Sequence, residues 1–103
     1  MNIEEIRIFL RALNNEDIHF KRHFYEKTAD RPVSESLVRE YLKKTDRLLK
    51  AEVQPSKIKG EEKYKLWIRL SNRYGLVAVI VISGKDLYII TAWNKERKWE
   101  KQR

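Results

Sequence analysis

Apolar residues spaced three and four positions apart open the chain and predict an amphipathic helix over residues 2–14. Asn2 can cap this helix, and Glu5 follows three residues later, as in a capping box. The apolar stripe consists of Ile3, Ile6, Leu10 and Leu13. One side of this helix should therefore pack on the rest of the protein.

Two further helices are predicted before the first strand. The second covers residues 19–30 and is capped by Asp17. Pro32 ends it, because the residue before a proline avoids the α region. The third begins after a Ser34 cap and runs to about Lys44.

Alternation with a period of two predicts four strands in the second half of the chain. They cover residues 47–54, 62–70, 76–83 and 87–93. In the second of these, Tyr64, Leu66, Ile68 and Leu70 face one way, and Lys63, Lys65, Trp67 and Arg69 face the other. The third is apolar on both faces and should be the central strand. Short connections, such as the Gly84-Lys85 turn, make the last three strands an antiparallel meander.

Three helices followed by four strands predict an α+β fold, with N-terminal helices packed on one face of a four-stranded, mainly antiparallel sheet. The length suits a single domain over residues 1–103. Within it we distinguish an additional helix (1–14), a core (17–97) and a basic tail (98–103). The acidic start is no signal peptide, the longest apolar run has seven residues, and cysteine is absent. We therefore expect a cytoplasmic protein without membrane contact.

The charge balance points to an anionic partner. The net charge is +8, with 23 Lys and Arg against 15 Asp and Glu. Residues 1–18 hold two Arg against four acids, so the excess lies in the rest of the chain. A basic body of this kind favours RNA or DNA as the partner. The alternative is surface charge on a small heat-adapted domain, since charged residues make up 37% of the chain.

Two histidines four residues apart invite comparison with a metal site. His19 and His23 would share one face of the second predicted helix, with Glu26 or Asp30 as a third ligand. The surrounding Lys and Arg oppose a divalent cation, and Phe20 stands where an HExxH motif needs glutamate. We therefore expect no metal and no other cofactor.

Basic and aromatic residues alternate along the strand at 62–70, and Trp93 lies on a nearby strand. Cations contact phosphates, and indole rings stack on unpaired bases. The candidate nucleic-acid-binding residues are Lys21, Arg22, Lys63, Lys65, Trp67 and Trp93. The alternative is that the two rings are half-buried packing residues and that the lysines form a solvated face.

Metal-independent RNA cleavage needs a base for the 2′-hydroxyl, cations for the phosphate and an acid for the leaving oxygen. His, Lys, Arg and Tyr side chains can divide these tasks. The catalytic candidates are His23, Lys27, Arg31, Arg69 and Tyr64. The first three are spaced four residues apart, so they can share one face over about two helical turns.

The segment Phe20-Lys21-Arg22-His23, followed by Arg31 and a short capped helix, resembles the opening of small prokaryotic proteins related to the BrnT toxins. These belong to the RelE/ParE toxin superfamily. The strand at 64–70, the valine-rich central strand and the last strand ending at residues 89–93 are also similar, so the resemblance covers about residues 17–97.

The resemblance implies a RelE-like fold and a metal-independent mRNA endonuclease of a toxin–antitoxin system. His23 matches the motif histidine and would act as general base or acid, with Tyr64 as a helper. Arg31 matches the motif arginine, and with Lys27 and Arg69 it would hold the phosphate. The implied partners are RNA, including ribosome-bound mRNA, an antitoxin protein, and a second copy in a homodimer. The alternative is a non-catalytic nucleic-acid-binding or protein-interaction module of the same fold.

Overall fold

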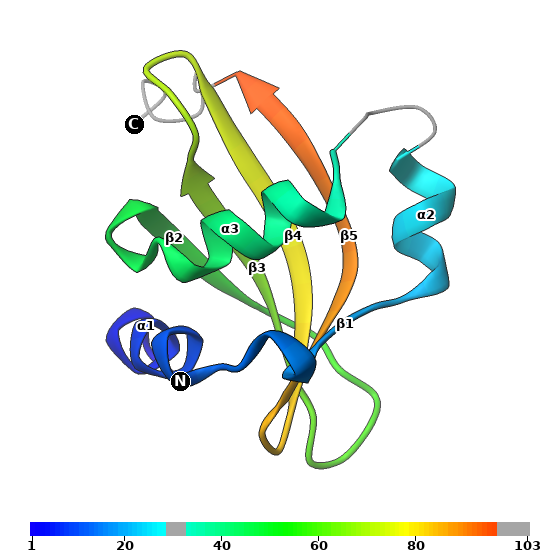
Figure 1. Ribbon diagram of the computed structural model, residues 1–103. Helices are drawn as coiled ribbons and strands as arrows, with labels where there is room; N and C mark the ends of the chain where they lie inside the picture. The colour runs from blue at the N-terminus through cyan, green and yellow to red at the C-terminus, as the bar shows by residue number, and fades with distance from the viewer. Residues whose placement is uncertain (29–32, 97–103) are drawn as a thin grey trace.

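The computed structural model describes residues 1–28 and 33–96, with only the backbone at residues 27 and 28. Figure 1 shows helices on a twisted sheet. In chain order the elements are α1 (Ile3–Ala12), a 3₁₀ turn (Asn15–Asp17), β1 (Ile18–Phe20), α2 (Arg22–Thr28), α3 (Glu35–Lys43), a second 3₁₀ turn (Thr45–Arg47), β2 (Leu48–Gln54), β3 (Glu62–Arg69), β4 (Tyr74–Ser83) and β5 (Asp86–Glu96). The predicted α+β class is confirmed.

The sheet has five strands in the order β1-β5-β4-β3-β2, so the predicted number of four is wrong. β1 runs parallel to β5, and the remaining neighbours are antiparallel. The antiparallel meander of the last three strands and the central place of β4 are confirmed. Gly84 has a φ of 60° in the turn between β4 and β5, a conformation that glycine adopts without strain.

The first part of the helix predicted over residues 19–30 is instead a strand. Ile18–Phe20 pairs with residues 87–89 of β5, and the Lys21 amide donates to the Ile89 carbonyl at 2.9 Å. This pairing satisfies backbone groups of β5 and buries Ile18. α2 then begins only at Arg22. His19 and His23 consequently lie on different elements, so the predicted shared helix face does not exist.

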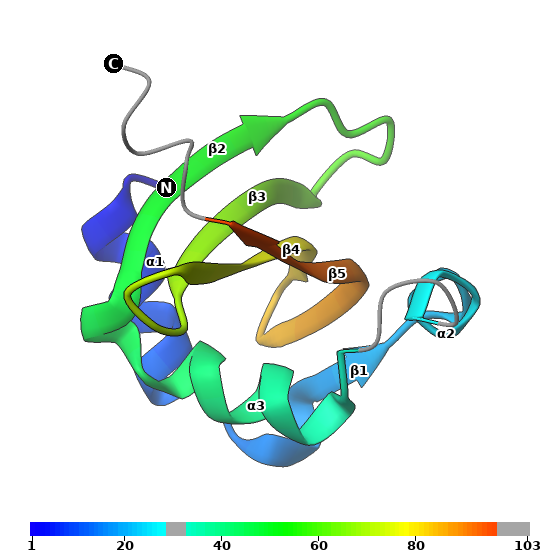
Figure 2. The same cartoon turned by 90° about the horizontal axis from the view of Figure 1, so that it is seen from above.

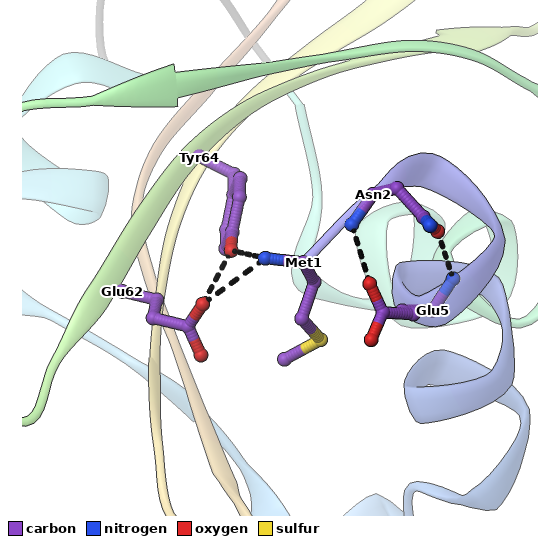
Figure 3. Close-up of polar contacts among 5 residues, drawn as sticks. All are labelled: Met1, Asn2, Glu5, Glu62 and Tyr64. Atoms are coloured by element: carbon purple, nitrogen blue, oxygen red, sulfur yellow. Dashed lines mark hydrogen bonds and ion pairs between the residues drawn. The ribbon is translucent and has the colours of Figure 1, made fainter.

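The predicted starts of the first and third helices are confirmed. The Asn2 side chain accepts from the Glu5 amide, and the Glu5 side chain accepts from the Asn2 amide, both at 2.9 Å. Figure 3 shows this reciprocal capping box. Ser34 Oγ accepts from the Leu37 amide at 3.1 Å and caps α3. Each cap satisfies backbone donors that have no partner inside the helix.

The core lies between the helices and one face of the sheet. Figure 2, seen from above, shows α1 and α3 on the same side of the curved sheet. From α1 and α3 the fully buried side chains are Ile6, Leu10, Val38 and Leu42; from β3 they include Leu66 and Ile68. Burying each such side chain stabilises the fold by about 1.5–3 kcal/mol. The apolar residues that recur every three to four positions in α1 and α3 thus pack against the alternating apolar residues of β3 in one core.

Cations of the helices are bound to backbone carbonyls. Lys43 Nζ on α3 donates to the carbonyls of Leu10 (2.9 Å), Arg11 (3.1 Å) and Leu13 at the end of α1. Arg7 similarly donates to the Leu48 carbonyl at 2.7 Å. A charged donor at a helix C-terminus satisfies its free carbonyls and offsets the helix dipole. These basic residues therefore have a structural role.

Replacing Lys43 by Met keeps a long apolar chain but removes the three hydrogen bonds to the end of α1. We expect the free energy of unfolding to fall by about 1–2 kcal/mol, because the helix loses a charged C-terminal cap. Urea denaturation followed by circular dichroism measures the change. The exposed Lys85→Met variant is the control and should unfold as the unsubstituted protein does.

Candidate nucleic-acid interface

The sheet face opposite the core carries the basic and aromatic residues of β3. Leu66 and Ile68 point into the core, so alternation places Lys65 and Trp67 on the opposite face. Figure 2 shows α1 and α3 on the other side of the sheet. Trp67 pairs with Val77 of β4, which in turn pairs with Trp93 of β5. We call the surface that includes these residues the open face.

Three lysines surround the ring of Trp67. The ammonium nitrogens of Lys50, Lys65 and Lys95 lie 5.5, 4.8 and 5.4 Å from its centroid. Lys65 Nζ also lies 5.6 Å from the Trp93 ring. Attraction between ammonium groups and the ring face allows the three charges to stand close together. Trp67 is only 6% exposed, so its ring lies beneath the three lysine side chains.

One carboxylate belongs to this cluster. Glu52 Oε1 accepts from Trp67 Nε1 at 3.1 Å and pairs with Lys50 Nζ at 3.0 Å. The hydrogen bond from Lys50 is the main cause that holds the pKa of Glu52 below its usual value. The three ammonium groups and this carboxylate leave a net charge of +2, which suits an anion.

A second aromatic centre lies at Tyr88, where β1 meets β5. The His19 ring stacks on Tyr88 with 4.9 Å between centroids, and Lys21 Nζ lies 4.7 Å from the Tyr88 centroid. His19 Nε2 is 3.1 Å from Asp86 Oδ1. The sequence did not point to Tyr88 or Asp86. Only the parallel pairing of β1 with β5 brings His19 and Lys21 close to them.

A groove of about 500 Å³ lies beside Tyr88, between the loop that follows β2 and the adjoining end of the sheet. Its walls combine three lysines, one acid, the tyrosine ring and small or apolar side chains. They are Lys21, Lys57, Lys63, Glu61, Tyr88, Pro55, Ser56, Ile58, Val81, Ser83 and Ile90. The groove thus offers cations at a partly apolar surface, a chemistry that suits a base with its phosphate.

Tyr64, a predicted catalytic helper, points into the core and is 2% exposed. Its hydroxyl lies 2.7 Å from the Met1 amino group and donates to Glu62 Oε1 at 2.6 Å, as Figure 3 shows. Burial, followed by the hydrogen bond to Glu62, raises the pKa of Tyr64 to about 12. Alternation along β3 puts Tyr64 on the opposite face from Arg69. The structure thus places this predicted helper of His23 among the buried side chains of the core, and its catalytic role stays a prediction.

The remaining catalytic candidates do not converge in the described residues. Arg69 is exposed at the end of β3 and donates to Asn72 Oδ1 at 2.9 Å. His23 is exposed on α2, which follows the edge strand β1, and β5 and β4 separate β1 from β3. The Lys27 side chain and Arg31 lie outside the described residues, as does the basic tail.

Of the predicted nucleic-acid-binding residues, Lys63, Lys65, Trp67 and Trp93 share the open face, and Lys21 lines the groove beside it. Arg22 is separate from them, because it is exposed on α2 and its Nε pairs with Glu26 Oε1 at 3.1 Å. Within residues 1–28 and 33–96, no three His, Cys, Asp or Glu side chains are grouped so that they could hold a metal. The helices in these ranges are too short or too polar to cross a bilayer.

No protein-family model, curated protein or solved structure matches this chain. The resemblance to BrnT-related and RelE-like toxins consequently stays a prediction.

The raised pKa of Tyr64 predicts a loss of stability in strong alkali. Above pH 10 the phenol of the unfolded chain ionises, whereas the folded protein keeps its proton until about pH 12. The free energy of unfolding should therefore fall between these pH values by roughly 2–3 kcal/mol, since one pKa unit corresponds to about 1.4 kcal/mol. Urea denaturation over this range should show a steeper loss for the unsubstituted protein than for Tyr64→Phe. Equal losses in the two proteins would contradict the assignment.

Proposed function

We propose that the open face binds single-stranded RNA, with backbone phosphates at the lysines and bases on the aromatic rings. The observation that supports this most directly is the Trp67 cluster, in which three ammonium groups gather around one indole. Their mutual repulsion is a cost that a bound phosphate would relieve. Trp93 lies beside the cluster and is half-buried, so a base can reach part of its ring.

The surface is long enough for several nucleotides. Trp93 and Tyr88 lie on the same strand, and their partners on β4 are four residues apart, a span of about 13 Å. Lys65 stands next to Trp93, and Lys21 stands next to Tyr88. Each ring thus has a cation beside it, which matches the repeating base and phosphate of a single strand.

The chemistry favours an unpaired strand over a duplex. Aromatic rings can stack only on bases whose faces are not covered by neighbouring base pairs, whereas a duplex presents its phosphates and groove edges. The choice of RNA over DNA rests on the resemblance to toxins that act on mRNA.

The lysines of the Trp67 cluster should set both the affinity and its salt dependence. In the Lys65→Ala/Lys95→Ala variant we expect weaker binding of a short single-stranded RNA. The slope of log affinity against log salt should become shallower by about 1.4, since each lost phosphate contact contributes about 0.7. Fluorescence anisotropy of a labelled oligonucleotide at several salt concentrations measures both quantities.

The matched control is Arg11→Ala/Lys85→Ala, which removes two exposed cations outside the cluster. Its salt slope should stay that of the unsubstituted protein. Equal slopes in all three proteins would contradict phosphate binding at the cluster. Affinity that does not depend on salt would favour the protein-interaction alternative.

Endonuclease activity is a separate proposal that concerns His23 on α2. Its imidazole is exposed, so an RNA substrate can reach it. If it serves as general base or acid, His23→Ala should lower the rate of RNA cleavage by about 10²-fold or more without weakening binding. Gel analysis of labelled RNA, with and without ribosomes, gives the rate. Equal cleavage by the two proteins, or none by either, would contradict the endonuclease proposal and leave only the binding proposal.

A further inference from the structure

β2 is an edge strand with exposed apolar side chains. It ends the sheet on the side away from β1, and no strand of the described residues lies beyond it. Val53 is 76% exposed and Leu49 is 38% exposed. An edge strand presents unpaired backbone donors and acceptors, so it is a natural site for adding another strand.

The sequence of β2 can complement itself. Two copies that pair antiparallel across a two-fold axis perpendicular to the sheet place one residue opposite its own copy at the centre. A centre at Lys50 or at Glu52 would put like charges opposite each other, which is unfavourable. A centre at Ala51 puts Lys50 of each copy opposite Glu52 of the other.

The same centre also matches the apolar residues. With Ala51 at the axis, Val53 of each copy comes opposite Leu49 of the other. Leu49 lies in a β-bulge, where the register with β3 shifts between Leu48 and Lys50. The bulge ends the regular ladder, so the paired segment is short and the association should be weak.

We infer that β2 is the contact edge of a homodimer, in which two five-stranded sheets join through antiparallel pairing centred on Ala51. The two-fold axis keeps the open faces of both copies on the same side of the joined sheet. Lys50, Lys65 and Glu52 belong to the Trp67 cluster, and β2 and β3 are neighbours. The two clusters would therefore flank the axis and form one continuous cationic surface.

Charge reversal at Lys50 or at Glu52, the two positions that flank Ala51, tests this pairing. Sedimentation equilibrium without RNA, at protein concentrations from about 1 to about 500 µM, should show reversible dimerisation of the unsubstituted protein. Lys50→Glu and Glu52→Lys should each dimerise at least about tenfold more weakly, because like charges then face each other twice. An equimolar mixture of the two variants should form a heterodimer, since two acidic side chains of one chain then meet two basic side chains of the other.

Two further variants keep the test independent of folding defects. Val53→Glu changes a side chain that is 76% exposed, and it should also weaken the dimer. Lys85→Glu makes the same charge change as Lys50→Glu in the exposed β4–β5 turn, and it should dimerise normally. A protein that stays monomeric throughout the range would overturn the inference. So would dimerisation of Lys50→Glu and Val53→Glu that equals that of the unsubstituted protein.

Discussion

The structure depends on the burial of a strand that is apolar on both of its faces. β4 lies at the middle of the sheet, and its residues from Leu76 to Ile82 are almost all buried. One face of β4 meets the core formed with α1 and α3. On the other face Val77 lies between Trp67 and Trp93. Large aromatic side chains on the open face therefore follow from the apolar nature of β4 before any ligand is considered.

The basic residues fall into two groups, which differ in the groups that their charged nitrogens contact. Arg7 and Lys43 donate to backbone carbonyls and hold the helices in place. Lys50, Lys65 and Lys95 instead lie over aromatic rings. A cation over a ring keeps N–H donors that can still bind an anion. In a cation that is hydrogen-bonded to carbonyls, those donors are already occupied. The high net charge alone does not separate these groups.

Local patterns were sufficient to predict the capped helices and the meander, because caps, turns and alternation act over a few residues. β1 was not predictable in this way. Its three residues continue smoothly into a helical pattern, and only pairing with β5, remote in sequence, makes them a strand. The open face of β3 followed from alternation. The roles of Tyr88 and Asp86 could not be predicted from alternation, because they depend on the pairing of β1 with β5. Tyr64 was assigned by residue type, although its own alternation with Leu66 and Ile68 already placed it in the core.

The parallel pairing of β1 with β5 also governs when the fold can be completed during synthesis. Ile18 pairs with Leu87, so this contact closes a loop of almost seventy residues. Closing long loops is slow because the chain must lose much of its conformational freedom first. A ribosome-bound chain cannot make this contact until the last strand has emerged. Until then β1 lacks its partner strand, so the contacts of His19 and Lys21 with Tyr88 cannot form before β5 has emerged.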